Sequence, residues 1–166
     1  MLKISFQSQT EPDLDIPSVI NKIKSFLEED ENAYYALTIG SDSEAKSTKL
    51  QKGVLEVITA IVIYRKGYGG RYFWYKRKAP PVKTLRDKIY IEVLQSIEIA
   101  KLFVPDLRVK LNGHTKYDLE IHIDVGEKGE TRAMIREVVG LVTGIGFVAK
   151  TKPESYAASN IADRYV

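Results

Sequence analysis

The segment from Val54 to Tyr64 constrains the fold of this chain more than any other stretch. It is rich in β-branched residues, which favour strands, and it is too apolar for a strand with one face in water. The glycine-rich turn Gly67-Tyr-Gly-Gly70 follows, and the chain returns through Arg71 to Lys78. These segments predict a β-hairpin whose first strand lies inside a covered sheet.

Helical periodicity, prolines and glycines divide the rest of the chain. The expected helices cover 16–27, 84–103, 130–143 and 154–165, and the expected strands cover 34–40, 54–64, 71–78, 107–111, 119–125 and 147–150. The polar stretch 41–52 is expected to be a turn or loop, and Pro105 is expected to stop the second helix. This order predicts one α/β domain, 1–166, in which an antiparallel hairpin joins a partly parallel sheet. Residues 1–32 would be a helical extension to a core of residues 33–166.

Four acidic residues lie where such a fold gathers ligands. Asp42 and Asp124 close two apolar strand segments, Glu92 lies in the helix 84–103, and Asp163 lies in the last helix. Strand ends are common ligand sites in α/β sheets, and carboxylates are the oxygen ligands that hard cations prefer. A metal pair can hold both the attacking and the leaving oxygen of a phosphodiester. The pattern favours a carboxylate site for divalent metal, although an ordinary surface acid is a competing interpretation, strongest for Asp163.

This element order, with acids at two strand ends and in two helices, resembles the ribonuclease H-like superfamily. Within it, the chain is similar to the YkuK-type family, an uncharacterised bacterial branch. The stretches that carry the resemblance are Ile39-Gly-Ser-Asp-Ser43, Arg65-Lys-Gly-Tyr-Gly-Gly-Arg-Tyr-Phe73, Leu85-Arg-Asp-Lys-Ile-Tyr-Ile-Glu92, Ile121-His-Ile-Asp-Val-Gly126 and Ala157-Ala-Ser-Asn-Ile-Ala-Asp163.

The resemblance implies a ribonuclease H-like mixed sheet and a metal-dependent nuclease that hydrolyses RNA, DNA or a hybrid. Asp42 would bridge two Mg²⁺ or Mn²⁺ ions, with Glu92 and Asp124 on one side and Asp163 on the other. Such a centre yields products with 5′ phosphates. Glu98 is an alternative helix ligand, but it points in a different direction from Glu92 on a helix. We favour Glu92, which lies nearer the helix start.

The charge distribution favours a polyanionic partner. Residues 1–31 hold three lysines against seven acids, a net charge of −4, so the remainder of this +3 chain carries +7. Between Arg65 and Lys88, nine Lys and Arg residues accompany one acid. A positive field of this kind attracts nucleic acid, although a solvated surface that aids solubility is the competing interpretation.

The strand 71–78 interleaves aromatic and basic residues, as nucleic-acid surfaces do. We predict that the substrate contacts are Arg71, Trp74, Lys76, Arg77 and Lys78. Alternation places Tyr72, Trp74, Lys76 and Lys78 on one face of the strand and Arg71, Phe73, Tyr75 and Arg77 on the other. The competing interpretation is a hairpin with one face in the core and lysines that protect an edge.

Composition narrows the remaining choices. The chain has no cysteine, which excludes disulfides, thiolate metal sites and cysteine nucleophiles. The start lacks a secretory apolar segment and no run approaches membrane-spanning length, so we expect a cytoplasmic protein without membrane contact. His122 shares a strand face with Asp124, but a packed or hydrogen-bonded histidine is the favoured interpretation. The alternative function is a non-catalytic nucleic-acid- or protein-binding module on the same fold.

Overall fold

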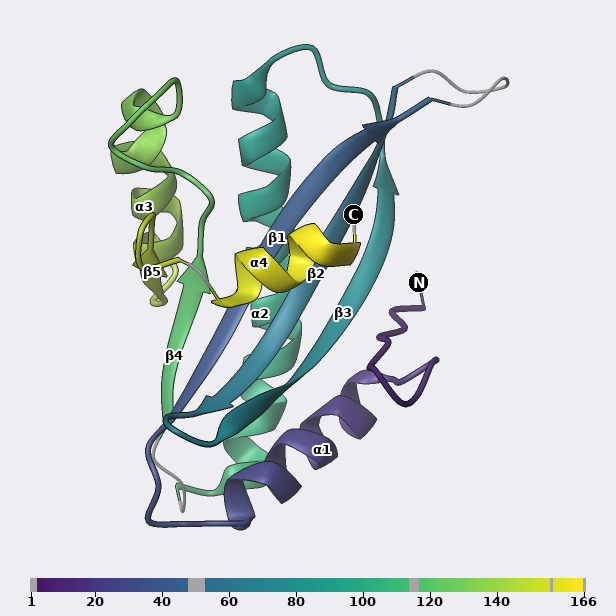
Figure 1. Ribbon diagram of the computed structural model, residues 1–166, viewed down its shortest axis with the longest axis vertical. Coiled ribbons are helices and arrows are strands. Elements are labelled where there is room, and N and C mark those ends of the chain that lie inside the picture. The colour runs from purple at the N-terminus through teal and green to yellow at the C-terminus, as the bar shows by residue number, and fades with distance from the viewer. Residues whose placement is uncertain (1–2, 48–52, 114–116, 156, 166) are drawn as a thin grey trace.

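The chain forms one twisted five-stranded sheet with helices on both faces (Figure 1). The computed structural model describes residues 3–47, 53–113, 117–155 and 157–165. The strands are β1 (Tyr35–Lys46), β2 (Val54–Arg65), β3 (Gly69–Ala79), β4 (Tyr117–His122) and β5 (Val148–Lys150), in the order β3-β2-β1-β4-β5. β1 and β3 both pair antiparallel with β2, whereas β1, β4 and β5 run parallel. The predicted α/β class, with a hairpin beside parallel strands, is confirmed.

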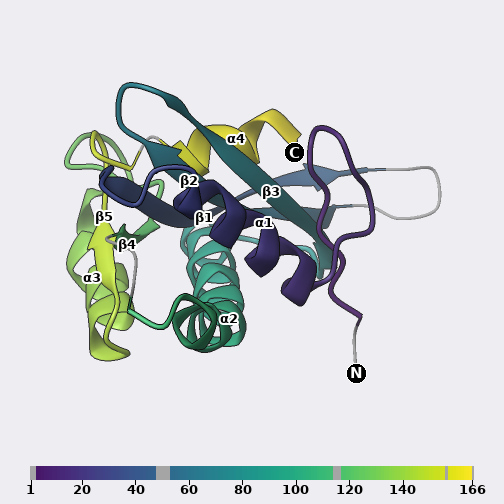
Figure 2. The ribbon, with the colours of Figure 1, turned by 90° about the horizontal axis from the view of Figure 1, so that it is seen from below.

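The helices divide unequally between the two faces. α1 (Ile16–Glu28), α2 (Leu85–Leu111) and α3 (Ile135–Gly144) cover one face, and the short C-terminal helix α4 (Ala157–Tyr165) crosses the other (Figure 2). A 3₁₀ helix, η1 (Arg132–Met134), leads into α3. Asp15 and Thr84 cap α1 and α2 by accepting hydrogen bonds from Ser18 N and Asp87 N at 2.9 and 3.0 Å. None of the helices in the described ranges is both long and apolar enough to cross a membrane.

Alternation along the strands produces two cores of unequal size. The side chains of Leu37, Ile61 and Phe73 lie in the main core with apolar residues of α1, α2 and α3. On the opposite face, Ile58, Ala60 and Trp74 pack with Ala162 of α4. The sheet is therefore buried on both faces at its centre, as the apolar character of residues 54–64 predicts.

The predicted loop at 41–52 is wrong for its first half, because β1 continues to Lys46. Ser41 to Lys46 pair in register with Val54 to Thr59, so the backbone hydrogen bonds of the hairpin are retained although the side chains are polar. The side chains from Glu44 onward are exposed, which removes any need for apolar residues there. Residues 48–52 of the predicted loop lie outside the described residues. Asp42 consequently lies within a strand instead of at its end.

The predicted stop at Pro105 and the predicted strand at 107–111 are also wrong. α2 passes through Pro105 and ends at Leu111, where Asn112 adopts a left-handed conformation with φ 47°. An interior proline costs about 3 kcal/mol. Burial of Phe103, Leu107 and Leu111 offsets this cost, since each such side chain contributes roughly 1.5–3 kcal/mol. The last helix begins at Ala157 instead of residue 154, and β4 ends at His122 instead of Val125.

Candidate metal centre

The candidate site lies where the parallel pairing of β1 and β4 ends. The last pair in that register is Gly40 with His122, and beyond it the described residues of β1 pair only with β2. Asp42 and Asp124 each follow this last pair by two residues, so they extend from neighbouring strands at the same level of the sheet. This register brings two acids so distant in the chain to the same level of neighbouring strands.

Glu92 approaches the same place from α2. Ser41 and Ser43 of β1 point toward α2, where the Ser41 hydroxyl lies 2.7 Å from the Ser96 hydroxyl and the Ser43 hydroxyl donates to Glu92 Oε1 at 2.6 Å. Asp42 lies between these serines, so alternation directs its Cβ to the opposite face. Its cross-strand partner there, Ile58, packs beneath α4. Glu92 therefore lies on the α2 face of β1 and Asp42 extends from the opposite face, at the same level of the sheet.

Two lysine ammonium groups lie among these acids. Lys88 Nζ is 2.8 Å from Glu92 Oε1 and 3.5 Å from Asp42 Oδ1, and Lys152 Nζ is 2.8 Å from Asp124 Oδ1. The backbone N–H of Ser43 also donates to Asp42 Oδ1 at 2.8 Å. Three of the four predicted acids thus have a cationic partner within 3.5 Å.

Asp163 is carried by α4 on the opposite face of the sheet from α2. It is exposed, whereas the preceding Ala162 is fully buried against the sheet. α4 is held by Tyr165, whose ring stacks on Trp74 at 3.8 Å between centroids and whose hydroxyl lies 3.0 Å from that of Tyr72. These aromatic contacts tie the end of α4 to β3, while the helix that carries Asp163 lies mainly over β1 and β2.

The pKa values of Asp42 and Glu92 are both raised, and the charges of the other acids contribute to these shifts. Burial raises the pKa of Asp42, Lys88 and the Ser43 N–H lower it, and the charges of Asp124 and Asp163 raise it further. Burial likewise raises the pKa of Glu92, against the lowering effect of Lys88 and Ser43, and the charge of Asp42 adds to the increase. Asp42 is therefore the electrostatic centre of the group, because its charge interacts with each of the other three acids.

The four carboxylates suit a hard divalent cation, but three of them form ion pairs with lysines in this structure. Glu92 and Asp124 line one small gap together with Ser41 and His122. Within residues 3–47, 53–113, 117–155 and 157–165, no three His, Cys, Asp or Glu side chains already stand in metal-ligating geometry. The ligands offered are all carboxylate oxygens, which Mg²⁺ and Mn²⁺ prefer, and Lys88 and Lys152 already contact three of them. The residues fit a divalent ion once an ammonium group moves aside.

Two sequence-based choices can be compared with the observed positions. Glu98 is exposed and lies 3.9 Å from Arg77 of β3, whereas Glu92 is buried beside Asp42 and Ser43. His122 is buried with Nε2 3.0 Å from Glu120 Oε2. Burial lowers the pKa of His122, and Glu120 opposes that effect. His122 is therefore a hydrogen-bonded strand histidine, which was the favoured interpretation.

The sequence interpretation missed the lysines of the site. Lys88 lies one turn before Glu92 on α2, and that spacing is a signal for an ion pair on one helix face. Lys152 follows β5, and its backbone N–H donates to Val125 O at 2.8 Å. The pairing of β4 with β5 brings Lys152 close to Asp124, and the local sequence does not indicate this pairing.

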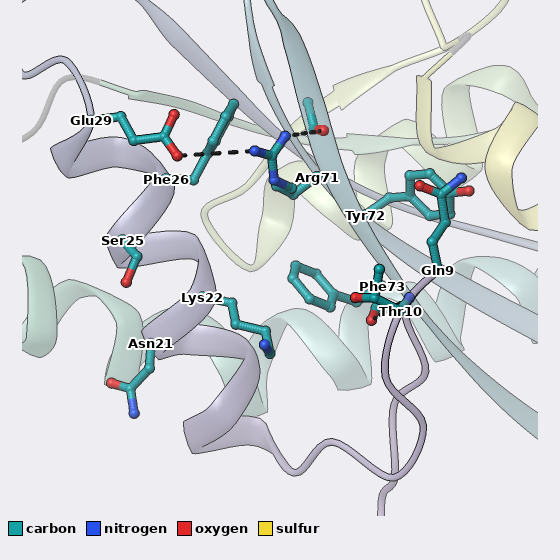
Figure 3. Close-up of a pocket in the computed structure, with 12 residues that line it drawn as sticks. Gln9, Thr10, Asn21, Lys22, Ser25, Phe26, Glu29, Arg71, Tyr72 and Phe73 are labelled. Carbon is teal, nitrogen blue, oxygen red and sulfur yellow. Dashed lines mark hydrogen bonds and ion pairs between the residues drawn. The ribbon is translucent and has the colours of Figure 1, made fainter.

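The five predicted substrate contacts do not share one surface. The face assignments of β3 are confirmed: Arg71 stacks over Phe26 of α1 at 4.7 Å and lies 3.9 Å from Glu29, as Figure 3 shows, and Arg77 faces α2. Lys76 and Lys78 lie on the opposite face, which is the face of Asp42; Lys76 pairs with Ile58, the cross-strand partner of Asp42.

Trp74 is 8% exposed and its ring stacks on that of Tyr165, so in this conformation it offers little free surface to a nucleic-acid base. The exposed basic side chains of this strand that share the Asp42 face are therefore Lys76 and Lys78.

The fold and the sequence together define the class of protein. The chain matches the Ribonuclease H-like family model over residues 18–166, and it belongs to that family. It is also 31% identical to the Uncharacterized protein YkuK of Bacillus subtilis (strain 168) over 172 aligned positions, which cover 96% of this chain and 95% of YkuK. No solved structure gives a significant match. The resemblance inferred from the sequence motifs is confirmed.

Proposed function

We propose that this protein is a divalent-metal-dependent nuclease that hydrolyses phosphodiester bonds of nucleic acid. The observation that carries the proposal is geometric: Lys88 of α2 contacts both Asp42 of β1 and Glu92, and Asp124 follows the strand paired with β1 at the same level of the sheet. Membership of the Ribonuclease H-like family supports the same reaction class. The four acids would hold Mg²⁺ or Mn²⁺, with Asp42 common to the group.

When bound, such a cation supplies charge stabilisation at phosphoryl oxygens and activation of water. Neighbouring residues of the chain would orient the carboxylates that bind the cation. The Ser43 hydroxyl holds one oxygen of Glu92, and the Ser43 N–H holds one oxygen of Asp42. Both contacts come from a strand that is paired on its β2 side throughout, so the ligand positions are set by rigid backbone.

Lys76 and Lys78 provide a path for the phosphate backbone on the Asp42 face. Lys76 lies two strands from Asp42 in register, a separation of about 10 Å at the usual strand spacing. Both side chains are exposed, although Lys76 also pairs with Glu56 at 2.7 Å. We propose these two lysines, rather than Arg71 or Arg77 on the other face, as phosphate contacts.

The direct test is a cleavage assay with the purified protein. Labelled single-stranded and duplex RNA and DNA, and an RNA–DNA hybrid, would be incubated with Mg²⁺, Mn²⁺ or EDTA. We expect cleavage of at least one substrate with metal and none with EDTA, with 5′ phosphates on the products. Failure to cut any of these substrates, combined with no effect of either ion on the melting temperature, would contradict the proposal.

Charge reversal at Lys76 and Lys78 is expected to weaken nucleic-acid binding without changing metal binding. The double variant Lys76→Glu/Lys78→Glu should raise Kd about tenfold or more, and the slope of log Kd against log salt should become shallower by about two. The matched control is Lys101→Glu/Lys110→Glu, which reverses two exposed lysines on α2. Fluorescence anisotropy over a salt series measures both quantities. Equal weakening by both variants would show that the Asp42 face has no special role.

The alternative is a non-catalytic nucleic-acid-binding module. The observation in its favour is that lysines already neutralise Asp42, Glu92 and Asp124. On this alternative, binding through Lys76 and Lys78 persists in EDTA, and no metal-dependent cleavage accompanies it.

A further inference from the structure

Lys88 occupies a cation position inside the candidate centre. Its ammonium group contacts two carboxylates at once, Glu92 at 2.8 Å and Asp42 at 3.5 Å. Lys152 contacts Asp124 alone within the described residues. The Lys88 side chain is 31% exposed and the Lys152 side chain 57%, so the two lysines differ in how readily water can replace their partners.

The position of Lys88 is fixed by the same elements that fix the acids. It lies four residues before Glu92 on α2, and the Glu92 side chain is 7% exposed and also held by the Ser43 hydroxyl. Departure of Lys88 would leave a buried carboxylate without its charge partner, which is costly unless another cation replaces it. Departure of Lys152 leaves Asp124, whose side chain is 38% exposed and can be hydrated.

Charge balance separates one divalent ion from two. One divalent ion together with Lys88 balances three of the four carboxylate charges. A second divalent ion beside a retained Lys88 would give the group a net positive charge and place a dication against an ammonium group. The fold therefore already supplies, on the side of Asp42 and Glu92, the positive charge that a second ion would bring.

We propose that Lys88 is the resident cation on the Asp42–Glu92 side, and that the centre binds one exchangeable divalent ion beside Asp124, in the place of the Lys152 ammonium group. This inference rests on the proposed function, because it requires that a divalent ion binds these carboxylates. Lys152 is the group that yields to the ion. Lys88 acts as a positioning residue that holds Asp42 and Glu92 and fixes the metal stoichiometry.

The test is the Mn²⁺ stoichiometry of the intact chain, measured by calorimetric titration and by electron paramagnetic resonance. We expect one Mn²⁺ per chain, with no spectrum of a coupled manganese pair at saturation. Lys88→Gln should bind two, and Lys88→Arg, which keeps the charge, should bind one. Lys152→Gln is the matched control: it should still bind one ion, but more tightly, because the competing ammonium group is gone.

Several outcomes would overturn the inference and identify the step that failed. Two Mn²⁺ ions in the parent chain, or one in a folded Lys88→Gln variant, would leave the proposed nuclease function in place and remove the role of Lys88. No Mn²⁺ binding in the parent chain would overturn the proposed function and this inference together. If Lys88→Gln does not fold, as judged by circular dichroism, the stoichiometry and spectra of the parent chain and Lys88→Arg decide the question.

Discussion

Replacing Asp42 with asparagine is expected to abolish cleavage and the stabilisation by Mn²⁺, while making the metal-free protein more stable at pH 7. Asparagine keeps the shape of the side chain but cannot supply the negative charge that a divalent ion requires. It also removes a charge that burial and the nearby Asp124 and Asp163 disfavour. We expect cleavage to fall by at least about 100-fold. The gain in metal-free stability should reach about 1 kcal/mol.

The pH dependence of this gain follows from the sign of the pKa shift. The pKa of Asp42 is higher in the folded state than the ordinary value of 3.8, so the protonated form favours folding. That contribution is fully present below the ordinary pKa and is lost as the pH rises through the raised one. The asparagine variant should therefore match the parent near about pH 3 and exceed it near pH 7.

Urea denaturation in EDTA at both pH values, and melting curves with and without Mn²⁺, measure these effects. Asp118→Asn is a suitable control, because Asp118 is an exposed acid of β4 away from the site. It should change stability by no more than about 0.5 kcal/mol and leave the Mn²⁺ response intact. An Asp42→Asn protein that is less stable at pH 7 in EDTA, yet still stabilised by Mn²⁺, would contradict the assignment.

Replacing Glu92 with glutamine should weaken metal binding and cleavage, because Lys88 loses the partner that holds it beside Asp42, whereas the same change at Glu98 should do neither. Both residues lie on α2, but Glu92 is buried against Ser43 and Lys88 and Glu98 is exposed. Glutamine can still accept the hydrogen bond from Ser43, so the helix should pack as before. We expect Glu92→Gln to lower Mn²⁺ affinity by at least the roughly 10–100-fold that loss of a supporting group costs at metal sites.

Calorimetric titration with Mn²⁺ and the cleavage assay, run on both glutamine variants, make this comparison. Because the two substitutions are chemically identical and six residues apart on one helix, a general effect of lost charge would appear in both. Equal losses, or a larger loss for Glu98→Gln, would show that Glu92 does not support the metal site.

Local patterns predicted the five observed strands but not their ends, and they also predicted a strand at 107–111 that is part of α2. The alternation in residues 71–78 predicts which side chains share a face of β3, and the apolar run 54–64 predicts a covered strand. The extent of β1 depends on pairing with β2 from Val54 onward, so the polar character of Ser41 to Lys46 was misleading. Pro105 was misleading for a similar reason, since burial of distant apolar residues kept α2 helical.

The site shows the same division between local and long-range information. The four candidate acids were selected from the sequence because each lies on a predicted element and matches a family motif, and their role as ligands stays a prediction. The burial of Trp74 could not be predicted from local sequence, because it depends on Tyr165 from the far end of the chain. Lys88 was overlooked because a lysine four residues before a glutamate is ordinary on a helix, and only the proximity of Asp42 gives it a further meaning.

A crystal structure of the protein grown with Mn²⁺ tests the central claim most directly. Anomalous scattering locates manganese without assumptions about its ligands. We expect a peak about 2.1 Å from a carboxylate oxygen of Asp42, with Asp124 and Asp163 turned toward it and Lys152 displaced. A structure in which manganese is absent from this position at saturating concentration, with Lys88 and Lys152 still on their carboxylates, would contradict the assignment of this centre as a metal site.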